Sequence, residues 1–104
     1  MKIQLKKGTL EMCVLAILSK ADSYAYDIVS QLEGGLDMSE GTIYPLMRRL
    51  QAEGWVTTYL VESESGPPRK YYKLTATAHE ELVRMRRDWH EFTTEVNKIL
   101  GATL

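Results

Sequence analysis

Two short stretches of the sequence collect side chains that bind phosphate groups and the edges of bases. One is a helical stretch whose outward positions are hydroxyl, amide and cationic side chains: Thr42, Tyr44, Arg48, Arg49 and Gln51. The other is residues 65–79, a segment without acidic residues that carries Arg69, Lys70 and Lys73. Lys and Arg are the main charged contacts to DNA phosphates, and Arg also reads guanine. We therefore expect these residues to bind double-stranded DNA, although the whole chain has a net charge of -1.

The sequence offers no set of residues for catalysis or for binding a metal ion. His79 and His90 are separated by about three turns of one expected helix, which is too far for a shared ion. The only cysteine, Cys13, cannot form an internal disulfide, and its apolar neighbours favour a buried thiol. There is no glycine-rich phosphate loop, nucleophile elbow or plausible carboxylate pair. We expect a protein that is not an enzyme and needs no cofactor.

The composition is that of one globular domain. Hydrophobic residues make up 44% and charged residues 26% of the 104 residues, close to the average soluble domain. The longest apolar run spans residues 12–18, whereas a transmembrane helix needs roughly twenty residues. The basic amino terminus lacks the cleavage site of a signal peptide. Its residues Lys6 and Lys7 either add phosphate contacts before the first helix or only make the terminus soluble. We expect a cytoplasmic protein with no membrane partner.

Hydrophobic periodicity predicts two helices in the first third of the chain. The first is expected over residues 9–19, with one apolar face formed by Leu10, Cys13, Val14, Ile17 and Leu18. The second is expected to open at Asp22 and Ser23, whose side-chain oxygens suit an N-cap, and to include Tyr24. Gly34 and Gly35 are expected to end it.

A third helix is expected over residues 39–54, and it contains a proline. Ser39 suits the N-cap position and Gly54 suits a left-handed stop. Pro45 has no amide donor and crowds the carbonyl of Gly41, a penalty that shrinks if the helix begins one or two residues after Ser39. The apolar positions of the inner face are Ile43, Leu46, Met47 and Leu50.

Strand-forming residues follow, and then a long amphipathic helix. Residues 55–62 and 69–74 are expected to pair as a hairpin, because the residues between them, 63–68, are polar, glycine and proline residues that form turns. Tyr71 and Tyr72 alternate, so one should pack inward and the other face outward. Thr75 is expected to cap a last helix that reaches about Leu100. Its apolar stripe repeats every three or four residues: Ala78, Leu82, Met85, Trp89, Phe92, Val96 and Ile99.

The last helix predicts a homodimer. At 1.5 Å per residue it is roughly 39 Å long, longer than the body that the other elements can build. The simplest way to bury the remaining apolar residues of this helix is contact with a second copy of the chain. The expected dimerisation residues are Leu82, Met85, Trp89, Phe92, Val96 and Ile99. The chain then divides into a DNA-binding part, residues 1–74, and a dimerisation helix, residues 75–104, packed on the same domain.

The order of three helices and a hairpin predicts a mainly α fold with a small β-hairpin, the winged helix-turn-helix. In that fold the third helix enters the major groove and the hairpin reaches the flanking backbone. The residues allow other interpretations: Arg48 and Arg49 as a solvated face, Tyr44 as a core aromatic, Arg69 and Lys70 as gatekeepers of an edge strand. The chain would then be a dimeric protein-interaction module without DNA binding, or a drug-binding dimer without regulatory output.

Five runs of residues resemble the PadR-like transcriptional regulators. They are KGTLE from residue 7, YAYDI from residue 24, SEGTIYPLMRRL from residue 39, EGW from residue 53 and RKYYKLT from residue 69. The similarity extends from residue 7 to about residue 82 and includes the unusual proline in the recognition helix. The resemblance implies a homodimeric transcriptional repressor that binds a pseudo-palindromic operator.

The single short helix after the wing is similar to that of a small, multidrug-sensing subfamily. In that subfamily, the resemblance implies, an indole from each last helix helps to form a flat pore at the dimer centre for planar aromatic compounds. Trp89 is at the matching position, and Met12 and Ala16 are on the matching face of the first helix. Met12 is larger than the family's pattern, and the neighbouring Arg86 and Arg87 argue against a preference for cationic compounds. We expect a planar aromatic effector to release the DNA.

Overall fold

The computed structural model describes residues 8–33, 36 and 39–101 of the chain. It is mainly helical with a small antiparallel sheet, which confirms the expected fold class. The elements in chain order are α2 (Thr9–Lys20), β1 (Ser23–Tyr24), α3 (Ala25–Leu32), α4 (Glu40–Ala52), β2 (Val56–Val61), β3 (Arg69–Leu74) and α5 (Ala76–Leu100). Lys6, Lys7, Gly34 and Gly35 lie outside the described residues, so their expected roles stay predictions.

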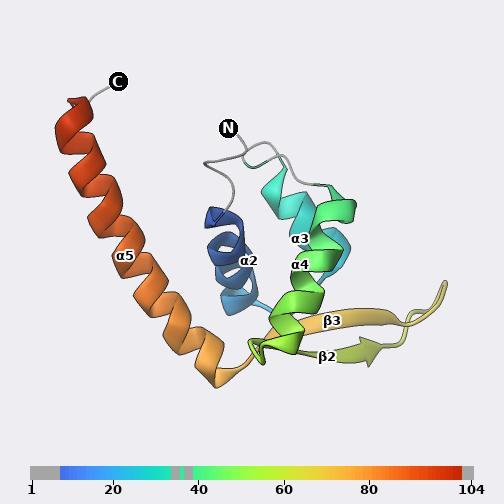
Figure 1. Cartoon of the computed structure of the whole chain (residues 1–104). Coiled ribbons are helices and arrows are strands. Elements are labelled where there is room, and N and C mark those ends of the chain that lie inside the picture. Colours follow the sequence, from blue (N-terminus) through green and yellow to red (C-terminus); the bar gives the residue numbers. More distant parts are fainter. Residues whose placement is uncertain (1–7, 34–35, 37–38, 102–104) are drawn as a thin grey trace.

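Helix α2 lies between α5 on one side and α3 and α4 on the other, with the sheet at one end of the helices (Figure 1). Because it has neighbours on two sides, α2 buries more than the single face expected from its periodicity. Leu15 is completely buried, whereas Leu10, Cys13 and Ile17 are only partly buried against the core. The core is formed by Val14, Leu15, Leu18, Ala25, Ile28, Val29, Leu32, Ile43, Leu46, Met47, Leu50, Val56, Tyr72, Leu74, Ala78 and Leu82.

Helix α4 begins and ends where the sequence predicts. Ser39 is the N-cap residue, and its carbonyl accepts bonds from the amides of Thr42 and Ile43 at 3.1 Å each. The helix continues through Pro45, and Gly54 follows it in the left-handed conformation with φ 79°. All four residues of the expected inner face are buried, so the side chains between them are turned to solvent.

The sheet has three strands in the order β1-β3-β2, whereas the sequence predicted a two-stranded hairpin. Ser23 pairs with Tyr72, and Tyr24 pairs with Tyr71, so these two residues form a strand instead of opening a helix. The N-cap of α3 is therefore Tyr24, and neither Asp22 nor Ser23 has the expected role. Pairing with β3 supplies backbone hydrogen bonds that a helical start at this position would forgo.

The expected first strand begins one residue late, at Val56. The amide of Trp55 donates to the carbonyl of Leu50 at 2.9 Å, which closes the end of α4. β2 and β3 pair as the expected antiparallel hairpin, with Val56 opposite Leu74 and Val61 opposite Arg69, so β2 ends one residue before the expected residue 62.

Helix α5 has the expected start and end. The hydroxyl of Thr75 accepts a bond from the amide of Ala78 at 3.3 Å and donates to the carbonyl of Gly54 at 2.9 Å, which fixes the start of α5 to the end of α4. Gly101 ends the helix with φ 86°. The far half of α5 extends away from the body (Figure 1). No helix in the described part of the chain has the length and apolar character that crossing a bilayer requires.

Candidate nucleic-acid interface

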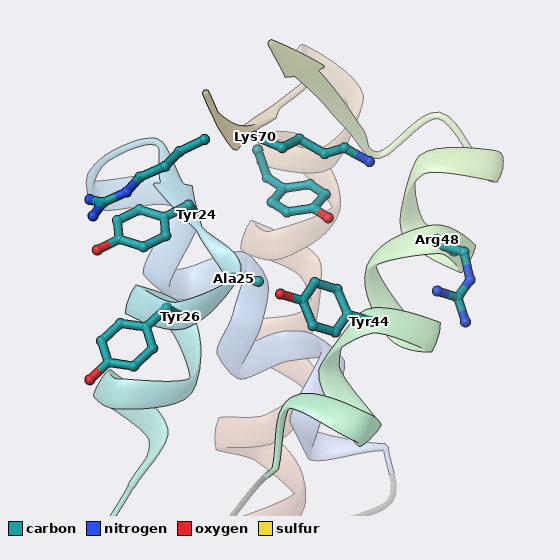
Figure 2. A pocket seen from close by; sticks show the side chains of 8 residues that line it. Tyr24, Ala25, Tyr26, Tyr44, Arg48 and Lys70 are labelled. Carbon is teal, nitrogen blue, oxygen red and sulfur yellow. The ribbon is translucent and has the colours of Figure 1, made fainter. Parts of the chain in front are cut away.

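The outward face of α4 and the base of the wing enclose a cleft of about 330 Å³, which we call the wing cleft. It is lined by Tyr24, Ala25, Tyr26, Tyr44, Arg48, Arg69, Lys70 and Tyr72. Four of the seven residues predicted to bind DNA therefore lie around one cleft, although they come from two distant segments. Figure 2 shows the Tyr44 ring pointing into this cleft from α4, Lys70 extending toward α4 and Arg48 at the outer edge.

Two of the three cations that line the wing cleft lie against tyrosine rings. The guanidinium carbon of Arg69 is 4.7 Å from the ring centroid of Tyr24, and the ammonium of Lys70 is 5.9 Å from that of Tyr72. Such contacts hold a cation in place while leaving its N–H groups free to donate. None of the eight lining residues is acidic. The wing cleft is therefore suited to an anion.

Tyr72 forms the inner wall of the cleft, and its ring belongs to the core. Burial raises the pKa of its phenol, as does nearby Tyr44, while Arg48 acts in the opposite direction. The prediction that Tyr71 and Tyr72 face opposite sides is confirmed. Tyr71 lies on the outer face of the sheet, between the rings of Tyr24 and Tyr59 at 5.5 and 5.7 Å.

Sequence reasoning missed three tyrosines of the cleft. Tyr24 is the last residue of β1 and the N-cap of α3, Tyr26 is the second residue of α3, and Tyr72 is in β3. The available signal was the pair of tyrosines in the YAYDI run, of which only Tyr24 was placed in a helical pattern. Tyr26 is 62% exposed.

The other predicted DNA-binding residues lie outside the wing cleft. Thr42 and Arg49 line a second hollow, between α4 and α2, together with Glu11. Nη2 of Arg49 is 2.8 Å from Oε2 of Glu11, and its Nε is 3.9 Å from Oε1 of Glu53. Lys73 is exposed in β3. The predicted DNA-binding residues therefore fall into different surroundings. Arg48, Arg69 and Lys70 line a cleft without acidic residues, whereas Arg49 already forms ion pairs with Glu11 and Glu53.

A third hollow, of about 280 Å³, lies between α2 and α5, and we call it the indole hollow. It is lined by Gly8, Thr9, Met12, Met85, Asp88, Trp89 and Phe92. Trp89 and Met12 are therefore brought together as expected, whereas Ala16 packs against the core and does not line the hollow. Asp88 is part of the lining, and Arg86 and Arg87 are not, so the local charge is opposite to that expected.

The remaining candidate groups have ordinary surroundings. Cys13 is half-buried, and burial raises the pKa of its thiol, which makes the reactive thiolate less available. His79 and His90 are exposed. Among residues 8–33, 36 and 39–101, no group of His, Cys, Asp and Glu side chains could hold a metal ion.

Comparison with known proteins identifies the family to which this fold belongs. A sequence model of the Transcriptional regulator PadR-like family matches residues 14–84. The chain belongs to the PadR-like family of transcriptional regulators. Because members of this family regulate transcription and are not enzymes, the expectation of a non-enzymatic protein is confirmed.

Solved structures of PadR-like regulators share this fold. A PadR-like regulator from Bacillus cereus is 39% identical and superposes with a TM-score of 0.85, covering 93% of this chain and 96% of its own. A PadR-like transcription factor from Bacteroides fragilis is 43% identical with a TM-score of 0.79, covering 92% and 94%. PadR of Bacillus subtilis, solved in complex with operator DNA, is 28% identical with a TM-score of 0.66, covering 78% of this chain and 46% of its own.

Proposed function

We propose that this PadR-like regulator is a homodimeric repressor that binds a pseudo-palindromic operator. The observation that carries the proposal is the wing cleft, in which recognition-helix and wing residues surround an acid-free hollow. Proteins bind duplex DNA by placing cations along the phosphate backbone, and a wing beside a recognition helix is positioned for this contact. The complex of Bacillus subtilis PadR with operator DNA supports the same role here.

In the proposed complex the two groups of residues have different tasks. Thr42, Tyr44 and Arg48 of α4 approach the bases and the phosphates that flank them, since all three are exposed on the side of α4 away from the core. Arg69, Lys70 and Lys73 hold the wing on the backbone. Arg49 joins the first group only if DNA displaces Glu11 from its guanidinium.

The exposed half of α5 supports the dimer. Trp89, Phe92 and Ile99 are 43%, 62% and 86% exposed although they continue the apolar stripe. Such a row on one helix is typical of an interface between helices. Leu82 is already buried within its own subunit, so the proposed interface begins at Met85 and continues through Val96 to Ile99.

The indole hollow is the proposed effector site. A planar aromatic compound stacked on Trp89 next to Met12 and Phe92 would contact both α2 and α5. If it binds better to a dimer in which the recognition helices are wrongly spaced, this differential affinity releases the DNA.

The first experiment is fluorescence anisotropy with duplex DNA from upstream of the protein's own gene, at several salt concentrations and with excess competitor DNA. Saturable binding of two chains per site is expected. Arg48→Ala should weaken binding and lower the slope of log K against log salt by about one unit per lost phosphate contact. Binding no stronger than that of competitor DNA, with no effect of Arg48→Ala, would favour a protein-interaction module instead.

A further inference from the structure

The hydroxyl of Tyr72 opens onto the wing cleft without a partner in the protein. Tyr72 as a whole residue is only 5% exposed. No hydrogen bond among the described residues involves its Oη, and no fully buried side-chain polar atom of the described chain lacks a partner. The Oη atom must therefore be accessible from the cleft that the residue lines. Buried tyrosine hydroxyls usually have a hydrogen-bond partner, so this one is available to a ligand that offers an acceptor oxygen.

The charges around the hydroxyl favour an anionic acceptor. Lys70 lies over the Tyr72 ring, and Arg48 lies near enough to act on the ionisation of the Tyr72 phenol. The lining residues include no carboxylate that could compete for these donors. Hydrogen bonds to charged acceptors are stronger than those between neutral groups, so a free hydroxyl with cations nearby favours an anionic acceptor.

The N-terminus of α3 adds to the positive electrostatic potential in the wing cleft. Ala25 is the first residue of this helix and lines the cleft. Its N-cap, Tyr24, makes no side-chain hydrogen bond to the first turn. The amide groups and the positive end of the helix dipole at this point favour an anion nearby.

We propose that the wing cleft holds one backbone phosphate of the bound DNA, with the Tyr72 hydroxyl donating to a phosphate oxygen and Lys70 and Arg48 supplying the charge. This proposal rests on the proposed DNA binding. It adds the Tyr72 hydroxyl as the group that holds the DNA backbone between the recognition helix and the wing. A DNA phosphodiester is the anion expected there, because the strand flanking a major groove occupied by α4 passes between α4 and the wing.

The test is the removal of one hydroxyl while the ring stays in the core. Tyr72→Phe should weaken binding to a random duplex at low salt about tenfold, since a hydrogen bond to a charged group is lost. The salt slope should not change, because no charge is removed, whereas Lys70→Gln should reduce both affinity and slope. A random duplex is sufficient because phosphate contacts are independent of sequence.

Tyr59→Phe is the matched control. It removes a hydroxyl from the opposite face of the same sheet, where Tyr59 donates to Asp22 at 2.7 Å and does not line the cleft. Its DNA affinity should equal that of the unmodified protein. Equal affinities for Tyr72→Phe and Tyr59→Phe would overturn the phosphate site while leaving DNA binding intact.

A second measurement observes the site itself. In protein labelled with ¹³Cζ-tyrosine, the Tyr72 resonance is identified by its loss in Tyr72→Phe. It should shift on addition of the duplex, and more weakly on addition of inorganic phosphate. A shift with phosphate but not with DNA would mean a free-anion site and overturn the backbone contact, and a shift with neither would overturn any phosphate site. Failure of the protein to bind any duplex would refute the proposed function separately.

Discussion

The guanidinium of Arg49 in the recognition helix α4 lies 2.8 Å from the carboxylate of Glu11 in α2. The next residue of α2, Met12, lines the indole hollow beside Trp89. One helix therefore contacts both the recognition helix and the proposed effector site. A shift of α2 caused by a ligand in that hollow would act directly on the position of Arg49.

Replacing Glu11 should strengthen DNA binding without loss of folding. Glu11→Gln removes a negative charge near the DNA face and frees Arg49, so affinity should rise by about two- to fivefold at low salt. The ion pair is partly exposed, with 54% of the Arg49 side chain and 23% of the Glu11 side chain accessible, and pairs open to solvent contribute about 1 kcal/mol or less, so the free energy of unfolding should change little. Anisotropy and urea denaturation measure the two effects.

Glu53→Gln is the comparison for this prediction. It changes the charge equally, but Glu53 is 3.9 Å from Arg49 and pairs with it less closely. Its effect on DNA affinity should be smaller. Equal gains from the two variants would indicate a general charge effect, and no gain from Glu11→Gln would show that Arg49 does not need release.

The features predicted correctly from the sequence are those that neighbouring residues determine. Ser39, Gly54 and Thr75 begin or end helices through groups only a few residues away, so their residue types identify them. The strand Ser23–Tyr24 was missed because its hydrogen bonds come from residues 71 and 72, far along the chain. No local pattern contains that partner.

The candidate site shows the same division. The cations at residues 48, 69 and 70 could be recognised from clustering alone. The three tyrosines that complete the wing cleft depend on the register of β1 against β3. The pairing of Arg49 with Glu11 likewise joins residues 38 positions apart, on helices whose packing the sequence pattern does not specify.

Truncation of Phe92 should dissociate the dimer without unfolding the subunit. Phe92 is 62% exposed in the single chain, so Phe92→Ser removes little from the subunit core but a large apolar contact from the proposed interface. Sedimentation equilibrium should show the dimer dissociation constant rising at least about tenfold. Val83→Ser is the control, since Val83 is 57% exposed on the same helix but outside the stripe. Equal dimer affinities for the two variants would contradict the α5 interface.

Alkaline pH should destabilise the protein partly through Tyr72. Burial raises the pKa of this phenol in the folded state above its ordinary value of 10.0. Below pH 10.0 the phenol is mostly protonated in both the folded and the unfolded state, so its contribution to the free energy of unfolding is fully present. As pH rises further, the unfolded chain ionises first, so stability falls until the folded-state pKa is passed. Tyr72→Phe should therefore lose less stability than the unmodified protein between pH 9 and about 11, measured by urea denaturation. Parallel losses would exclude Tyr72 as a cause.

Asp88 should select planar aromatic cations at the indole hollow. Its carboxylate lines the hollow, whereas Arg86 and Arg87 do not, so a cationic compound should bind more tightly than a neutral one of the same shape. Asp88→Asn should weaken binding of an acridinium dye about three- to tenfold and leave a neutral isostere unaffected. The measurement is fluorescence quenching in a Trp55→Phe background, in which Trp89 is the only remaining tryptophan.

Glu91→Gln is the control for this prediction. It makes the same charge change at an exposed position of α5 that does not line the hollow, so it should have no effect on binding of the dye. Equal weakening by both variants would assign the preference to the net charge of the protein, and no quenching by either compound would leave Trp89 as a packing residue.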